Sequence, residues 1–244
     1  MTLSYEVMAP IYDAIWGDVS RQRYLPVVLD WIKGRNAATT RVLDLACGSG
    51  QFADALRTLG CRVYGGDASA ALIARAQRRA PNVEFSVCSM DQLPYSANAF
   101  DVVLCIFDSI NHIERNALGI VFSEVFRVLG AGGQFIFDVN TAEGFSARWC
   151  GQTSVIRNDL VCVAQSSFDS IEGIGRMKLT AFDQLDGQRW NRRDATITEW
   201  VHAPSALSDC LRTTGFSQVR SHQSTDLGNV RDVGRMFYRA TKSL

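Results

Sequence analysis

The 244-residue sequence predicts an open α/β fold, in which helices cover both faces of a mainly parallel sheet. Three observations support this prediction. Short apolar segments alternate with helical segments between residues 41 and 140, as in βαβ units. Val102–Phe107 is a continuous apolar run, as expected for a central strand covered on both faces. A glycine-bearing turn directly follows the first strand, where such sheets bind ligands.

The predicted elements follow in order along the chain. Residues 3–33 have helical character and form an N-terminal lid, with boundaries expected at Pro10 and Pro26 because proline interrupts a helix. The core strands are expected at 41–46, 61–66, 83–88, 100–106 and 134–139. The core helices are expected at about 51–59, 69–79 and 114–129.

The pattern changes after Thr141. Residues 153–201 alternate apolar and polar positions, and Asp186-Gly187 is a typical hairpin turn, so we expect an antiparallel β insert after strand five. A helix with Ser205 as its N-cap follows, and two strands end the fold. We therefore expect a single domain over 1–244. Its parts are a lid at 1–38, a core at 41–140, an insert at about 143–201 and a C-terminal segment at 203–244.

Composition narrows the class of partner. The 25 basic residues balance the 25 acidic ones, so no overall field attracts nucleic acid or an anionic membrane. No apolar run has the length of a membrane span, and the N-terminus lacks the pattern of a signal peptide. The seven cysteines show neither paired nor metal-ligand spacing. We expect a cytoplasmic protein without disulfides or a metal.

The segment Arg41–Gly50, with the sequence RVLDLACGSG, is the strongest indication of function. Its glycines allow the backbone to approach a ligand closely. Asp67 ends the second strand about 20 residues beyond these glycines, the offset at which a carboxylate accepts ribose hydroxyls. Ala53 would occupy the third glycine position of a dinucleotide fingerprint, which leaves a nicotinamide dehydrogenase as one alternative.

The segment Asp44–Gly50 resembles motif I of the class I S-adenosylmethionine (SAM) methyltransferases. The resemblance implies that the turn at 46–50 lies under the methionine moiety of SAM and that Asp67 binds its ribose. The expected cofactor-binding residues are Tyr12, Arg21, Arg23, Asp44, Ala46, Gly48, Gly50, Asp67, Ala68, Ser89, Met90, Asp91, Ile106 and Phe107.

Two further segments resemble the same family. Cys88–Tyr95 is similar to the adenine-binding segment of this family, except that Ser89 stands where an acid is expected. Either Ser89 or Asp91 then holds the adenine amine. Met90 either covers the adenine ring or belongs to the hydrophobic core. Tyr12–Trp16 resembles a lid motif whose tyrosine points at the methyl group. Arg21 or Arg23 would then pair with the SAM carboxylate, unless the segment is simply an amphipathic helix packed on the sheet.

Polar residues follow the fourth strand, where parallel sheets line a ligand crevice. They are Asp108, Ser109, Asn111 and His112. Because the ordinary pKa of histidine is near neutrality, His112 is a candidate general base. Asn111-His112 also suits the cap of the following helix, and the two interpretations are compatible.

Together these motifs look like the sugar N,N-dimethyltransferases and related small-molecule methyltransferases. In the sugar enzymes, the pair matching Tyr12 and His112 flanks the acceptor amine, so we assign both as catalytic. The insert covers the substrate there. The expected substrate-binding residues are Trp16, Asp108, Ser109, Asn111, Trp149, Arg176 and Trp200. Relatives of this kind are often dimeric, which leaves a homodimer open.

We therefore expect a SAM-dependent methyltransferase that acts on an amine or hydroxyl of a small polar acceptor and releases S-adenosylhomocysteine. An RNA- or protein-directed methyltransferase is the first alternative, although neutral charge and the absence of an N-P-P-(Y/F) motif argue against it. The second alternative is a non-catalytic protein that binds SAM or S-adenosylhomocysteine.

Overall fold

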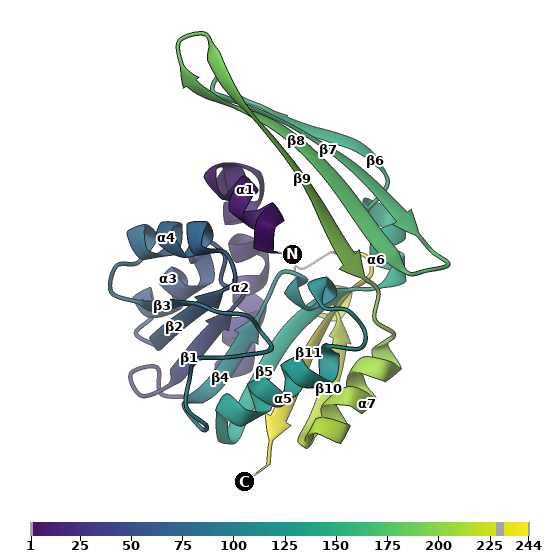
Figure 1. The fold of residues 1–244 in the computed structure, drawn as a ribbon. Coiled ribbons are helices and arrows are strands. Elements are labelled where there is room, and N and C mark those ends of the chain that lie inside the picture. The colour runs from purple at the N-terminus through teal and green to yellow at the C-terminus, as the bar shows by residue number, and fades with distance from the viewer. Residues whose placement is uncertain (1, 228–231, 244) are drawn as a thin grey trace.

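A seven-stranded sheet forms the centre of the computed structural model, which describes residues 2–227 and 232–243 (Figure 1). The strands lie in the order β10-β11-β5-β4-β1-β2-β3, and the pairs among β1 to β5 are parallel. Their bounds are β1 Arg41–Leu45, β2 Arg62–Asp67, β3 Glu84–Val87, β4 Phe100–Cys105, β5 Leu129–Asn140, β10 Phe216–Gln223 and β11 Arg235–Lys242. The predicted α/β class is confirmed. Positions 1, 228–231 and 244, which the predicted domain includes, lie outside the described residues.

Helices cover both faces of this sheet. The core on one face includes side chains of α2 (Asp18–Ile32) and α3 (Gln51–Thr58), with α4 (Ala70–Arg79) beside α3. The core on the other face includes α5 (Leu118–Val128) and α7 (Pro204–Thr214). Val102, Val103 and Leu104 of β4 are fully buried between the two layers. This burial explains the continuous apolar run in the sequence.

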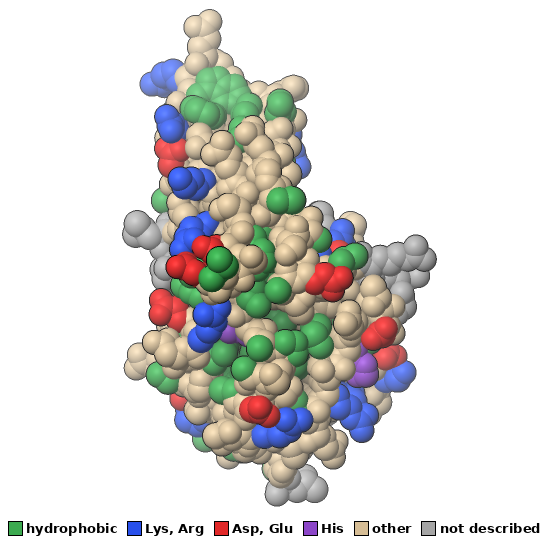
Figure 2. Space-filling view, turned by 90° about the vertical axis from the view of Figure 1, so that its right-hand side faces the viewer, with side chains coloured by type: hydrophobic (Ala, Val, Ile, Leu, Met, Phe, Trp, Pro, Cys, Tyr) green, Lys and Arg blue, Asp and Glu red, His purple; other side chains and the backbone are tan. Residues whose placement is uncertain are grey.

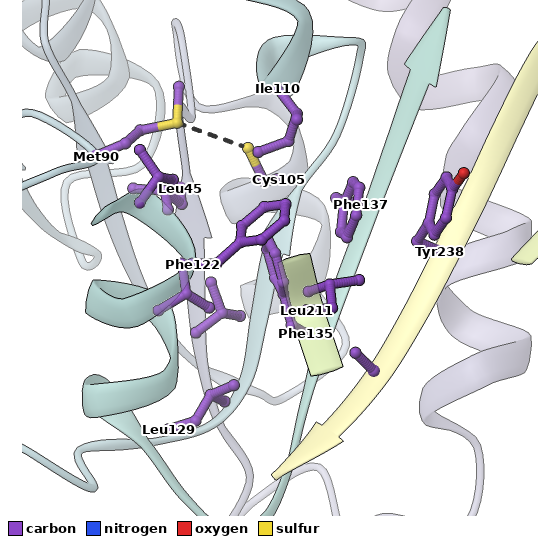
Figure 3. Close-up of a cluster of buried hydrophobic side chains, with 14 of the residues drawn as sticks. Leu45, Met90, Cys105, Ile110, Phe122, Leu129, Phe135, Phe137, Leu211 and Tyr238 are labelled. Atoms are coloured by element: carbon purple, nitrogen blue, oxygen red, sulfur yellow. Dashed lines mark hydrogen bonds between the residues drawn. The ribbon is translucent and has the colours of Figure 1, made fainter. Parts of the chain in front are cut away.

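Strand β11 adds to β5 in the antiparallel direction, and β10 pairs with β11. The join is packed with aromatic rings: Phe137 of β5 stacks on Tyr238 of β11 with ring centroids 4.8 Å apart, and Phe122 of α5 lies 5.7 Å from Phe137 (Figure 3). Such aromatic pairs stabilise the contact between β5 and β11 by more than the burial of their apolar surface alone.

The N-terminal lid consists of α1 (Thr2–Tyr12), one π-helical turn η1 (Asp13–Gly17) and α2. Pro10 and Pro26 lie inside α1 and α2, so the expected boundaries at the prolines are wrong. A proline removes one hydrogen bond from a helix, and buried neighbours such as Met8 and Val28 hold both helices in place. The break falls at η1 instead.

The predicted β insert is present as a four-stranded antiparallel sheet. It follows α6 (Ala142–Arg148) and comprises β6 Gly151–Ile156, β7 Leu160–Asp169, β8 Ile174–Asp186 and β9 Arg189–Trp200. Asp186 pairs with Arg189 across the turn, as the Asp-Gly dipeptide predicts. In Figure 1 the insert stands above the core sheet, and α1 lies beneath it.

A third hydrophobic cluster joins the lid to the insert. Met8 and Ile11 of α1 pack in it with Phe145 of α6 and with strand residues of the insert. The Ser4 hydroxyl also donates to the carbonyl of Thr196 at 2.7 Å. The lid and the insert therefore form one cover over the carboxyl end of the core sheet.

The C-terminal helix α7 begins at Pro204, with Ala203 as its N-cap, so Ser205 is not the cap. Proline is favoured at a first helical position because its missing N–H has no partner there in any case. In the described part of the chain, no helix is long and apolar enough to cross a bilayer.

Candidate active site

A cavity of about 340 Å³ lies where the carboxyl ends of β1, β2, β4 and β5 meet the cover. The chain crosses over between β1 and β4, which is the position at which open α/β sheets bind ligands. Residues of the core line its floor, while α1, η1 and the β8–β9 hairpin supply its roof. The predicted site residues that line it are Tyr12, Trp16, Arg23, Ala46, Gly48, Asp67, Ala68, Ser89, Met90, Ile106, Phe107, Asp108, Ser109, His112 and Trp149.

The turn after β1 passes closely under the lid. Ala46, Gly48 and Gly50 all have positive φ angles, of 56°, 56° and 83°. A Cβ atom at Gly48 would lie 3.2 Å from the Tyr12 hydroxyl oxygen, so glycine allows the turn to meet this ring. A Cβ atom at Gly50 would lie 2.9 Å from the Cβ of Ala76, so this glycine serves the packing of α4 and does not line the cavity.

Asp67 ends β2 at the cavity wall. One carboxylate oxygen accepts the Gly48 N–H and the other accepts the Ser69 N–H, both at 2.9 Å. Burial raises the pKa of Asp67, and the two backbone donors act in the opposite direction. Each oxygen retains a lone pair for a further donor, so the carboxylate can hold two hydroxyl groups.

Asp44 lies beneath the turn and outside the cavity lining. It is 3% exposed, one of its carboxyl oxygens has no hydrogen-bond partner, and burial raises its pKa to about 7. The Ala53 N–H lowers the pKa in part. Asp44 is therefore placed to support the turn at 46–50 and does not contact the cavity.

The wall beyond Asp67 is mainly apolar. Ala68, Ile106 and Phe107 line it together with Met90, which is 7% exposed and lies with its sulfur 4.0 Å from the Cys105 thiol (Figure 3). Ser89 and Asp91 were alternative partners for an adenine amine. Ser89 lines the cavity, whereas Asp91 is exposed and does not.

The segment after β4 is held in an unusual backbone conformation. Phe107 and Asp108 have φ angles of 71° and 51°, and the buried carboxylate of Asp138 accepts their N–H groups at 2.6 and 3.1 Å. Arg235 forms an ion pair with Asp108 at 2.9 Å and another with Asp138. Strained residues persist where the surrounding structure holds them, as this ion-pair network does here.

His112 lies at the roof end of the cavity, with 7% of its side chain exposed. Its Nδ1 is 3.4 Å from the carbonyl oxygen of Thr198, and its Nε2 is 3.0 Å from the Tyr5 hydroxyl. A carbonyl only accepts, so we place the hydrogen on Nδ1, which leaves Nε2 as the acceptor. Burial lowers the pKa of His112, so the imidazole is neutral at pH 7.

The remaining candidates from the sequence serve other contacts. Asn111 is fully buried and ties η2 (Ser109–His112) to Asn140 and to the Trp200 carbonyl, so it positions the segment after β4. Trp200 and Arg176 lie outside the cavity lining, and Arg176 is 3.8 Å from Glu172 in an exposed ion pair.

The two lid arginines differ in position. Arg23 lines the cavity but already pairs with Asp232 at 2.8 Å, and Tyr24 donates a hydrogen bond to the same carboxylate. Arg21 is half-buried and does not line the cavity.

Sequence reasoning did not assign several residues of the cavity wall a role. They are Tyr5, Tyr24, Asn140, Arg148, Glu199, Asp232 and Arg235. Tyr5 is seven residues before Tyr12, which places both on one helical face, so this spacing was an available signal. Glu199 shares one face of β9 with the buried Ile197, but the alternation of faces alone does not reveal which face of a strand meets a ligand.

Comparison with known proteins agrees with this geometry. A family model described as a methyltransferase domain matches residues 42–133. YqeM of Bacillus subtilis, which is named a methyltransferase, is 25% identical over 98% of this chain and 97% of its own length. UbiE of Desulfotalea psychrophila, named a C-methyltransferase of ubiquinone/menaquinone biosynthesis, is 31% identical over 77% of this chain and 70% of its own.

Solved structures share the fold. A SAM-dependent methyltransferase from Clostridium acetobutylicum has a TM-score of 0.81 at 20% identity, over 98% of this chain and 99% of that one. The sugar N-methyltransferase KedS8 from Streptoalloteichus has a TM-score of 0.73 at 16% identity, over 93% of this chain and 88% of its own. At this identity the likeness establishes the fold alone. With the sequence relatives and the site, it places the chain in the family of class I SAM-dependent methyltransferases.

Proposed function

We propose that this enzyme methylates an amine or hydroxyl group of a small polar acceptor. One observation carries the proposal: a neutral, buried His112 lies with Tyr5 at the roof end of a cavity whose floor carries the glycine turn and Asp67. A proton acceptor therefore lies in the same cavity as the turn and the carboxylate that we expect to bind the cofactor. The small volume and the roof formed by the lid and insert favour a small acceptor over a macromolecule.

The floor of the cavity fits SAM. The two oxygens of Asp67 have acceptor capacity left for the two ribose hydroxyls. The turn at Gly48 is a cradle that a Cβ would fill, since that atom would press on the Tyr12 ring. Met90 and Phe107 add apolar surface at the same end, which suits the adenine ring. Asp67, the turn and this wall are the residues that we expect to hold the cofactor.

When bound, SAM supplies an activated methyl group on its sulfonium, so the protein has to align the acceptor, exclude water and take up a proton. The proton that leaves the acceptor amine or hydroxyl is taken up by the pair of Tyr5 and His112: the Tyr5 hydroxyl, which donates to Nε2 of His112, passes its own proton to Nε2 and takes the acceptor's proton in its place. The Tyr5 hydroxyl and the Thr198 carbonyl orient the ring for this task. The Tyr12 ring lies over Gly48 and closes the space between the floor of the cavity at Asp67 and its roof end at His112.

The charge distribution agrees with a small-molecule acceptor. The chain has no net charge, and on the face shown in Figure 2 the basic side chains are interspersed with acidic ones. A nucleic-acid-directed enzyme needs a basic patch or stripe instead. The name of KedS8 as a sugar N-methyltransferase supports an amine acceptor, whereas the name of UbiE specifies transfer to carbon.

Calorimetry followed by an acceptor screen tests the proposal. We expect micromolar binding of SAM and S-adenosylhomocysteine, no binding of NADH, and methylation of at least one small amine or alcohol detected by mass spectrometry. Binding of SAM without turnover on any acceptor class would favour the non-catalytic alternative. Transfer to carbon only, or to RNA or protein only, would contradict the proposed acceptor.

A further inference from the structure

Glu199 of β9 is a buried carboxylate on the roof of the cavity. It is 4% exposed, and its Oε2 atom is fully buried without a hydrogen-bond partner. Its Oε1 atom lies 3.6 Å from Nε2 of His112, which is beyond hydrogen-bond distance. A buried carboxyl oxygen without a partner costs folding free energy, so this oxygen is a candidate for contact with a ligand in the cavity.

The groups around Glu199 stabilise its ionised form only in part. The groups facing it are Tyr5 from the lid, and Asp108, His112, Asp138 and Arg235 from the core. Tyr5 and His112 are uncharged at pH 7, because burial shifts each pKa toward the neutral form. Arg235 is already paired with Asp108 and Asp138. Burial, with help from Asp108 and Asp138, holds the pKa of Glu199 well above its ordinary value and so favours its neutral form, while Arg235 and a side-chain hydrogen bond with Asn140 lower the pKa in part.

The other carboxylates of the cavity wall are supplied with donors. Asp67 accepts two backbone N–H groups, Asp108 pairs with Arg235, and Asp232 pairs with Arg23 and accepts from Tyr24. Among the cavity-lining carboxylates of the described residues, Glu199 alone has a fully buried oxygen without a partner. A cationic donor would stabilise the ionised form of Glu199, and the cavity is the place from which it can arrive.

We propose that Glu199 Oε2 binds the protonated nitrogen of the methyl acceptor, so that the acceptor is a primary or secondary amine entering as its ammonium form. This inference rests on the proposed function and narrows it. Binding of an ammonium group favours the ionised form of Glu199, because the ammonium supplies both a positive charge and a hydrogen-bond donor. A hydroxyl group supplies a donor but no charge, so it does not compensate the cost of ionising the buried carboxyl group.

The neighbouring imidazole then makes the nitrogen nucleophilic. One N–H bond of the ammonium breaks, its electron pair stays on nitrogen as the lone pair, and the proton moves to the Tyr5 oxygen while the Tyr5 hydroxyl passes its own proton to Nε2 of His112. The resulting imidazolium lies 3.6 Å from Glu199 Oε1, so the same carboxylate that held the ammonium stabilises the charge after it has moved. Glu199 therefore acts on the acceptor before the transfer and on His112 after it.

The first test uses methylammonium as the smallest probe of this class. The protein is labelled with ¹³C at glutamate carboxyls, saturated with S-adenosylhomocysteine and titrated by NMR in equal concentrations of methylammonium chloride or sodium chloride. The Glu199 signal is the one absent from Glu199→Gln. We expect methylammonium to lower its pKa by about one unit or more, as an adjacent cation does. An equal pKa in both salts overturns the proposal.

The second test compares matched acceptors, namely ethanolamine with ethylene glycol and glucosamine with glucose. We expect methylation of amines only, and an increase in KM of about 10- to 100-fold in Glu199→Gln with the Kd of SAM unchanged. Glu84→Gln, which alters an exposed carboxylate outside the cavity lining, is the control. Methylation of the alcohols alone overturns the amine inference but leaves the proposed function intact. If none of these four compounds is methylated, the wider acceptor screen decides the proposed function, and the methylammonium titration still decides the role of Glu199.

Discussion

The carboxylate of Asp67 is oriented by the backbone N–H groups of Gly48 and Ser69 before any ligand binds. We expect Asp67→Ala to weaken SAM binding by about 100-fold or more, because two charge-assisted hydrogen bonds to the ribose are lost. Calorimetry with SAM measures the effect. Asp91→Ala removes an exposed acid outside the cavity and should leave the affinity unchanged. Near-normal affinity in Asp67→Ala would contradict the ribose assignment.

His112 carries the second prediction at this scale. We expect His112→Ala to lower kcat by about 10²- to 10⁴-fold while the Kd of SAM stays within about twofold. Steady-state kinetics and calorimetry separate the two effects. His222→Ala changes an exposed histidine outside the cavity and serves as the control. An unchanged kcat in His112→Ala would reduce His112 to an anchor of the η2 turn.

The direction of the His112 pKa also predicts a pH profile. Burial disfavours the imidazolium, so the folded-state pKa lies below the ordinary value of 6.5 and the base form is present at pH 7. We expect the acidic limb of kcat/KM that belongs to His112, which reports the free enzyme, to fall below about pH 6.5. The stability that this neutral burial contributes is present above that pH and decreases as the pH falls through it. A limb at or above pH 7 would contradict this assignment.

At the scale of elements, the π turn η1 fastens the lid to the cofactor end. The Asp13 carboxylate accepts hydrogen bonds from the Ser49 hydroxyl, from the Gln51 amide at 2.7 Å and from Arg75 at 2.9 Å. Burial raises the pKa of Asp13, but these donors outweigh it and the pKa is lower than usual. π turns are frequent at functional sites, and here the turn sets Asp13 opposite the residues that flank Gly50.

We therefore expect Asp13→Asn to loosen the lid and to weaken SAM binding by about 10-fold, because charge-assisted bonds to the turn become neutral ones. Hydrogen exchange should rise over residues 5–16. Asp30→Asn, which removes an exposed i,i+3 ion pair of α2 with Lys33, is the matched control and should change neither quantity. Unaltered exchange and affinity in Asp13→Asn would show that the lid is held by its apolar contacts alone.

For the whole molecule, the cluster shared by lid, α6 and insert decides whether the cover stays in place. Phe145 is fully buried in it, with ring centroids 5.0 Å from Trp149 and 5.3 Å from Phe168. We expect Phe145→Ala to lower the free energy of unfolding by about 3–5 kcal/mol, measured by chemical denaturation. Ile171→Ala, at a position 96% exposed, should change it by less than about 0.5 kcal/mol. Similar losses in both variants would mean that the cover contributes little to stability.

Local patterns were sufficient for most of the fold. Apolar residues that lead into the glycine turn identified β1, the continuous apolar run identified β4, and the Asp-Gly dipeptide identified the β8–β9 hairpin, because each pattern depends on residues close together in sequence. The helix boundaries at Pro10 and Pro26 were wrong, since neighbours distant in sequence hold the helices across each proline. Ser205 was not the N-cap, because the preceding Pro204 already takes the first helical position.

The sequence by itself determined the α/β class and the positions of the glycine turn and of Asp67 at the ends of β1 and β2. It could do so because the strand–turn–helix unit and the strand after it are consecutive along the chain. Only the tertiary structure decided that Tyr5, His112 and Glu199 meet. They come from α1, from the turn after β4 and from the insert, and 194 positions separate the first from the last. The third hydrophobic cluster closes that distance by packing the lid against the insert. Apolar packing is non-directional, so a local pattern marks which residues are buried but not which of them become neighbours.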